Sequence, residues 1–98
     1  MREVEIAGRK YRIKELTYGE VLELLEASTR TIITPAGDVR QVTDLKGSGL
    51  ALLRLCVEVE DSGRYRPLAD DEIKRLPASH GMKLADECLA VNSFLRAA

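Results

Sequence analysis

The first fourteen residues carry the pattern of a β-hairpin. Apolar and charged positions alternate in two short segments, which the dipeptide Gly8-Arg9 separates. Alternation is typical of strands with one buried face, and glycine at the first position of a two-residue loop is typical of a type II′ turn. The expected register pairs apolar residues on one face and opposite charges on the other: Ile6 with Tyr11, Val4 with Ile13, Glu5 with Arg12 and Glu3 with Lys14.

Residues 17–28 are expected to form a helix. Thr17 and Glu20 have the spacing of a capping box, which closes the first turn of a helix. Apolar residues at helical spacing then predict one inward stripe, with Leu24 at its edge. The stripe consists of Tyr18, Val21, Leu22, Leu25 and Ser28. Glutamates 20, 23 and 26 fall on the opposite side, which we expect to face solvent.

Two alternatives stay open for residues 29–47. Thr31 to Thr34 is β-prone, and Pro35 to Asp38 is a turn signal before a second β-prone segment. The segment is therefore either a second hairpin or a loop, and its place between two helices makes it a candidate contact site.

The next segment, 48–60, is expected to be a central helix. Its apolar residues cover most of the circumference, and only Ala51, Arg54 and Glu58 mark a polar arc. Such a helix is either fully buried or has an outer face that meets a partner. A polar connector follows over 61–67.

The last third predicts two more helices. A short one spans 70–76, with Ala69 or Asp70 as its cap and Pro77 as its end. The final helix spans 79–95. Together these segments predict one domain over 1–98 of the α+β class, mainly α, with the N-terminal hairpin packed on a bundle of three to four helices.

Composition narrows the classes of function. The chain has 98 residues, with 15 basic and 16 acidic side chains and a net charge of -1, so we expect no nucleic-acid partner. Its longest apolar stretch, Leu50 to Val59, is shorter than the roughly 20 residues that a membrane helix needs. The two cysteines, Cys56 and Cys88, are expected to be buried thiols, with a bridge open if their helices pack side by side.

Candidate chemistry is sparse. His80 is the one histidine, and no nucleophile, phosphate-loop or zinc-protease motif accompanies it. The acidic run 70–72 is better explained by helix capping than by metal binding. We therefore expect no enzyme activity, no cofactor and no metal, and favour a protein that binds another protein.

Three segments resemble the small tail assembly chaperones of long-tailed bacteriophages and prophages. The opening from Val4 to Thr17 resembles the hairpin of these proteins, which runs into an x-L-T helix start. Leu68 to Pro77 is similar to their L-S-x-E-E-I-x-x-L-P segment, with Ala69 in place of the serine. The third segment that resembles these proteins is the amphipathic closing helix with Val91-Asn92-Ser93-Phe94. The resemblance covers about half of the chain and leaves out residues 29–47.

The resemblance implies a non-enzymatic chaperone in the cytoplasm of a bacterial host. Such proteins bind the tape measure protein, keep it soluble, help to deliver tail tube subunits and leave before the virion is complete. A homo-oligomer is compatible with this role. The expected partner-binding residues are Leu24, Leu52, Leu55, Val59, Met82, Leu89 and Phe94. The alternatives are a structural tail or head-completion component, or a small protein-binding regulatory or antitoxin-like protein.

Overall fold

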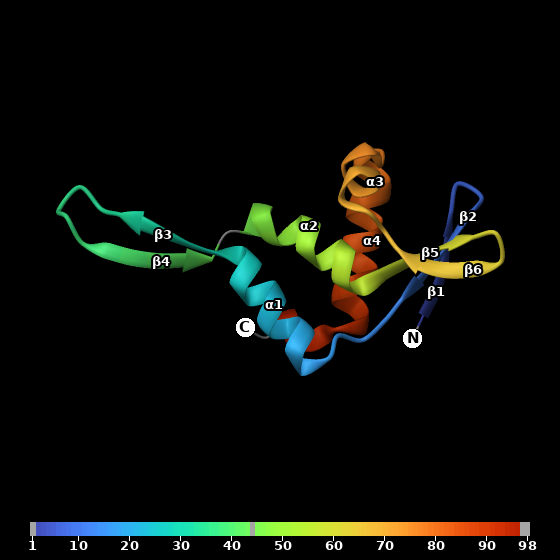
Figure 1. Ribbon diagram of the computed structural model, residues 1–98, viewed down its shortest axis with the longest axis horizontal. Coiled ribbons are helices and arrows are strands. Elements are labelled where there is room, and N and C mark those ends of the chain that lie inside the picture. The colour runs from blue at the N-terminus through green and yellow to red at the C-terminus, as the bar shows by residue number, and fades with distance from the viewer. Residues whose placement is uncertain (1, 44, 97–98) are drawn as a thin grey trace.

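The chain folds as a mixed α+β protein, in which a four-stranded sheet and a second hairpin lie at opposite ends of a group of helices (Figure 1). The structure, a computed structural model, describes residues 2–43 and 45–96, and the side chains among them other than those of 29–30, 41–48 and 96. The strands are β1 (Arg2–Ile6), β2 (Arg9–Ile13), β3 (Thr29–Ile33), β4 (Val39–Thr43), β5 (Val57–Asp61) and β6 (Arg64–Pro67). The helices are α1 (Tyr18–Ser28), α2 (Leu45–Cys56), α3 (Asp70–Arg75), α4 (Ala78–Val91) and the 3₁₀ helix η1 (Ser93–Arg96).

The main sheet is antiparallel, with the strand order β1-β2-β5-β6. The expected helix over 48–60 is therefore wrong in its last four residues, because α2 ends at Cys56 and β5 follows at once. Val57 and Val59 alternate with glutamates, which suits a strand with one buried face. The predicted packing of a lone hairpin on a helix bundle is not confirmed, since β2 pairs with β5 and the hairpin becomes half of this sheet.

The first hairpin forms, but its predicted register is wrong by two residues. Val4 lies opposite Tyr11, and the loop is Ala7-Gly8, with φ of 51° and 79°. Positive φ at both loop positions is the geometry of a type I′ turn, whose twist matches the flanking strands. A shift of two residues leaves every side chain on its expected face, so Tyr11 and Ile13 are still buried.

The start of α1 confirms the predicted capping box. The Thr17 Oγ1 accepts a hydrogen bond from the Glu20 backbone N–H at 3.2 Å, and the Glu20 carboxylate accepts one from the Thr17 N–H at 3.0 Å. The same carboxylate also meets the Lys14 Nζ at 2.7 Å. This bond to Lys14 lowers the pKa of Glu20 below its ordinary value, with help from the Thr17 N–H.

Helix α2 is the central helix of the fold. It packs against α1, α3 and α4, and its C-terminal half supplies four buried residues to the core. These are Ala51, Leu52, Leu53 and Cys56. The helix begins at Leu45, three residues before the expected start.

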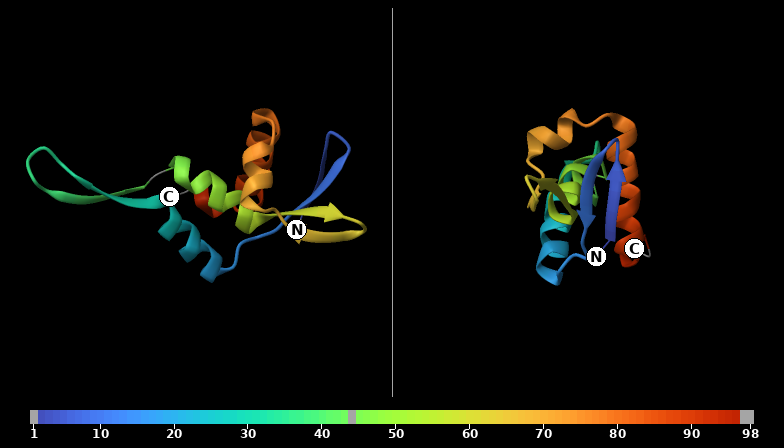
Figure 2. Two further views of the ribbon diagram at one scale, coloured as in Figure 1. Left: turned by 45° about the horizontal axis from the view of Figure 1, so that its top comes forward. Right: turned by 90° about the vertical axis from the view of Figure 1, so that its right-hand side faces the viewer.

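Of the two alternatives for 29–47, the structure shows the hairpin. Strands β3 and β4 pair with each other and form a sheet of their own. A hydrogen bond from the Thr34 N–H to the Asp38 carbonyl, at 2.8 Å, closes the turn. Gly37 adopts a φ of 87° there. This hairpin projects from the helices in Figure 1 and in the left view of Figure 2, and the molecule measures 54 Å along its longest axis. The remainder of the expected segment, 44–47, contains the start of α2.

The two C-terminal helices are shorter than expected. Helix α3 ends at Arg75 instead of 76. Its N-cap is Ala69, with no side-chain cap, and Glu72 instead accepts the Ala69 N–H at 3.1 Å. Helix α4 spans Ala78–Val91 and stops at Asn92, so the expected helix over 79–95 is broken there and continues as η1.

The buried side chain of Asn92 explains this break. Its Oδ1 accepts the Leu16 backbone N–H at 2.8 Å. Its Nδ2 donates toward the carbonyls of Lys14 and Cys88, at 3.2 and 3.0 Å, and toward the Cys56 Sγ at 3.2 Å. One amide thus joins the linker before α1, the end of α2 and the last turn of α4, with none of its surface exposed.

The two cysteines lie against this amide as free, buried thiols, so the bridge that the sequence left open is not formed. The Cys56 thiol donates to the Lys14 carbonyl at 3.0 Å. A hydrogen bond with Cys56 raises the pKa of Cys88, and burial raises it further. Cys88 is therefore a protonated thiol at neutral pH.

We expect Asn92→Ala to lower the free energy of unfolding by about 2–4 kcal/mol, because it leaves the buried Leu16 N–H without its acceptor and removes one hydrogen bond each from the Lys14 and Cys88 carbonyls. Urea denaturation followed by circular dichroism measures this difference. Ser93→Ala, on the exposed neighbouring residue, is the control and should change stability by less than about 0.5 kcal/mol. Equal stability of Asn92→Ala and the wild type would show that the amide is dispensable.

Candidate interaction surface

The seven residues expected to bind a partner do not form one surface. Three of them belong to the core, where Leu24, Leu52 and Val59 are at most 8% exposed. The alternative in which the 48–60 segment turns an outer face to a partner is wrong for Leu52 and Val59, because both lie in the core. Leu55 and Leu89 are half-buried and pack against the core. Met82 and Phe94 are exposed, at 70% and 46%.

Among the helical side chains that the structure describes, the large exposed apolar residues gather mainly on α1. Tyr18 is 79% exposed, Leu22 49% and Leu25 51%. Residues three and four apart share a helix face, so these three form one stripe along the outside of the helix. We call the three residues the α1 stripe.

The sequence placed the α1 stripe in the core. The apolar arc of this helix runs from Leu24 to Leu22 over nearly half of its circumference, and only one side of that arc packs on α2. The buried side contains Leu24 and Ser28. The Ser28 hydroxyl is satisfied there by the Leu24 carbonyl at 2.9 Å and the Leu25 carbonyl at 3.1 Å. The width of the arc was the signal that part of it would stay outside a small core.

Two glutamates border the α1 stripe. Glu26 lies one turn after Leu22, and Glu23 follows around the circumference; both are exposed. Among the residues that the structure describes, neither has an ion-pair partner. Glu20 differs, because Lys14 binds it.

A second exposed apolar group lies on the projecting hairpin. Ile33 and Val39 are 75% and 69% exposed and lie directly opposite each other on β3 and β4. Cross-strand neighbours contact each other on one face of a hairpin. The left view of Figure 2 shows that this hairpin projects from the body of the molecule, so the exposed pair Ile33 and Val39 lies away from the core.

The open face of the main sheet is polar. The Arg12 guanidinium stacks on the Tyr65 ring at 3.9 Å and meets the Glu3 carboxylate at 3.6 Å. The Arg12 Nε has no hydrogen-bond partner, so the ion pair with Glu3 and the stacking on Tyr65 hold this guanidinium. The charged side chains on this face make it a poor apolar docking surface.

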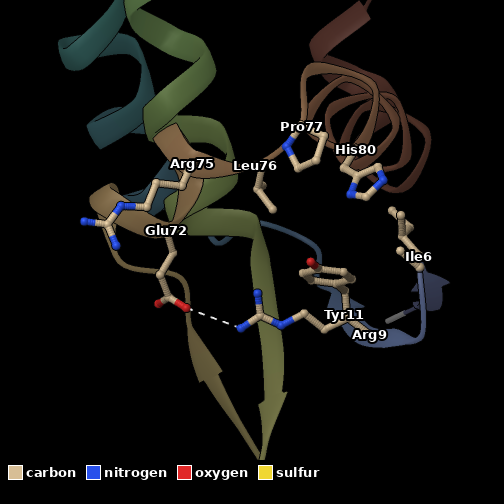
Figure 3. A pocket seen from close by; sticks show the side chains of 9 residues that line it. Ile6, Arg9, Tyr11, Glu72, Arg75, Leu76, Pro77 and His80 are labelled. Atoms are coloured by element: carbon tan, nitrogen blue, oxygen red, sulfur yellow. Dashed lines mark hydrogen bonds and ion pairs between the residues drawn. The ribbon is translucent and has the colours of Figure 1, made fainter.

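A cavity of about 370 Å³ lies between the β1–β2 loop and the start of α4 (Figure 3). The Tyr11 ring and His80 form part of its wall, and Arg9 reaches across to Glu72 at 3.4 Å. Its lining contains no serine, threonine or cysteine that could serve as a nucleophile for His80. The cavity can hold a small group, but its described lining supplies no catalytic pair.

Within the acidic run 70–72, Glu72 forms an ion pair with another side chain of the protein. The Arg66 guanidinium binds both oxygens of Glu72, at 2.6 and 2.9 Å, and also meets Asp61 at 2.9 Å. Over the part of the chain that the structure describes, no three histidine, cysteine or acidic side chains come together as metal ligands. Within the same part, no helix combines the length and apolar character needed to cross a membrane.

Comparison of the chain with models of protein families, with curated proteins and with solved structures finds no match.

The pH dependence of stability tests the role of Glu72. The bonds from Arg66, and next the Ala69 N–H, lower the pKa of Glu72 from 4.5 to about 2. A carboxylate whose pKa is lowered by folding stabilises the fold above its unfolded pKa, and this stabilisation disappears as the pH falls through the folded pKa. We expect the wild type to be more stable than Glu72→Gln at neutral pH, and the two to converge between about pH 4.5 and about pH 2.

Urea denaturation across this pH range gives the difference directly. Asp71→Asn changes the exposed neighbour in the same first turn, where the helix dipole is shared but Arg66 is not. It should show a much smaller dependence on pH. A Glu72→Gln difference that stays constant with pH would contradict the assignment.

Proposed function

We propose that this protein is a phage or prophage tail assembly chaperone that acts without catalysis. It binds the tape measure protein, keeps it soluble during tail assembly in the host cytoplasm, and is absent from the mature virion. The tail tube protein is a second expected partner. The proposal combines the resemblance of the sequence segments with one structural observation, the exposed α1 stripe.

The α1 stripe supports the proposal because, among the residues that the structure describes, most of Tyr18 and about half of each leucine stay exposed. Contiguous exposed apolar surface on a small protein is typical of a protein-binding site. A long helical partner that aggregates through its own apolar face can bury that face against such a stripe. Met82, in contrast, is a single exposed apolar residue on α4, and single residues of this kind are common on protein surfaces.

Two of the segments that resemble tail assembly chaperones lie in well-defined elements. The opening segment is the β1–β2 hairpin together with the capping box of α1. The segment from Leu68 to Pro77 contains the buried Leu68 and helix α3. The α1 stripe thus directly follows the first of these two segments in the chain.

Co-expression with the tape measure protein encoded beside this chain tests the proposal. Leu22→Gln/Leu25→Gln keeps good helix formers on α1 but removes both leucines of the stripe. We expect the soluble fraction of the tape measure protein to fall several-fold, since two exposed leucines each contribute on the order of 1 kcal/mol when a partner buries them. Unchanged solubility would overturn the assignment of the surface.

Met82→Gln is the matched control, because it removes a similarly exposed apolar side chain from another helix. It should leave the tape measure protein soluble. Circular dichroism and the thermal midpoint of each variant show whether the fold is intact, which separates loss of binding from loss of structure.

The projecting hairpin favours one second candidate, a structural component of the tail or head. An arm with an apolar patch, such as Ile33 and Val39, suits contact with a neighbouring subunit in a permanent assembly. Mass spectrometry of purified virions distinguishes the two functions. A chaperone is absent from them, whereas a structural component is present.

A further inference from the structure

Within the described part of the structure, the two glutamates beside the α1 stripe, Glu23 and Glu26, form no ion pair. Helix α1 carries no basic residue in its last turn, although Glu26 lies near that end. The carboxylate there faces the negative end of the helix dipole, and Glu23 lies three residues away with the same charge. Both electrostatic interactions are unfavourable, and no described side chain forms an ion pair with Glu23 or Glu26 that would offset them.

The contrast with the start of the same helix is informative. Glu20 lies in the favourable first turn, caps the helix and binds Lys14. The Glu20 carboxylate is therefore paired within the protein, with the Thr17 N–H and the Lys14 ammonium. The carboxylates of Glu23 and Glu26 have no such role, yet they border an exposed apolar stripe.

We infer that α1 binds an amphipathic helix whose apolar stripe is flanked by lysine or arginine. The α1 stripe would bury the leucines of that helix, while its basic flank would meet Glu23 and Glu26. The eleven residues of α1 measure about 16 Å, so the contact spans about three turns of the partner. This inference rests on the proposed function, because it specifies the chemistry of the segment that the chaperone binds.

Two model peptides of about 18 residues test the inference. Both carry leucine at positions i, i+3, i+4 and i+7, and they differ only in flanks of lysine or of glutamate. Fluorescence anisotropy with labelled peptide measures their affinity for the full chain. We expect the lysine peptide to bind about three- to tenfold more tightly at low salt, with an advantage that shrinks as salt is added.

Two variants of equal charge change assign the effect to this site. Glu23→Gln/Glu26→Gln raises the net charge by two, and so does Asp86→Lys on the exposed surface of α4. The first should remove most of the advantage of the lysine peptide, and the second should keep it. Equal affinity of the two peptides, or an equal effect of the two variants, would overturn the inference.

The peptide and tape measure experiments can fail separately. If Leu22→Gln/Leu25→Gln abolishes binding of the lysine peptide but leaves the tape measure protein soluble, the inference holds and the proposed function fails. If the same variant reduces tape measure solubility while lysine and glutamate peptides bind equally, the proposed function holds and the inference is overturned.

Discussion

The fold depends on one buried amide. The Asn92 side chain accepts a hydrogen bond from the Leu16 N–H and donates to acceptors at the ends of β2, α2 and α4. It is fully buried. A backbone N–H in a buried linker has no strand or helix partner, so without this side chain its burial would be costly. The chain stops α4 at Val91 and turns Asn92 inward, which supplies the partner from the opposite end of the sequence.

This constraint fixes where α1 lies and which side of it is buried. Leu16 is held at the amide, and the capping box starts the helix two residues later. The helix then packs on α2 through Leu24 and Ser28, while β5 and β2 close the core on the other side. The core takes Leu24 from α1 and its other members mainly from β2, α2, β5 and α4, and the α1 stripe stays outside it. The exposed surface that supports the proposed function is thus a consequence of how the small core is closed.

Local signals in the sequence predicted the elements that local chemistry determines. The capping box of Thr17 and Glu20 is confirmed in full, and the alternation over the first hairpin identifies its buried face. The β5 strand was missed because Val57 and Val59 continue an apolar run that also fits a helix, and short runs of this kind do not distinguish the two. The hairpin register failed because Ala7 adopts the left-handed conformation, which glycine usually takes.

The interaction surface and the amide needed information that no local pattern contains. An arc of apolar residues predicts a helix, but which half of a wide arc faces inward depends on the volume of the whole core. Asn92 and Leu16 are 76 residues apart, and nothing around either residue indicates their bond. The sequence therefore placed Leu24 at the edge of the inward stripe, as a partner-binding residue, and Tyr18 within that stripe, whereas the structure buries Leu24 and exposes Tyr18.

Hydrogen exchange of the Leu16 amide is the most direct test of the Asn92 closure. The Leu16 N–H lies in a linker outside any helix or strand, and its described acceptor is the Asn92 Oδ1. If the Asn92 side chain closes the core, the Leu16 N–H exchanges only through global unfolding. It then exchanges as slowly as the backbone N–H groups that pair β2 with β5. Exchange as fast as in exposed linkers would contradict the account.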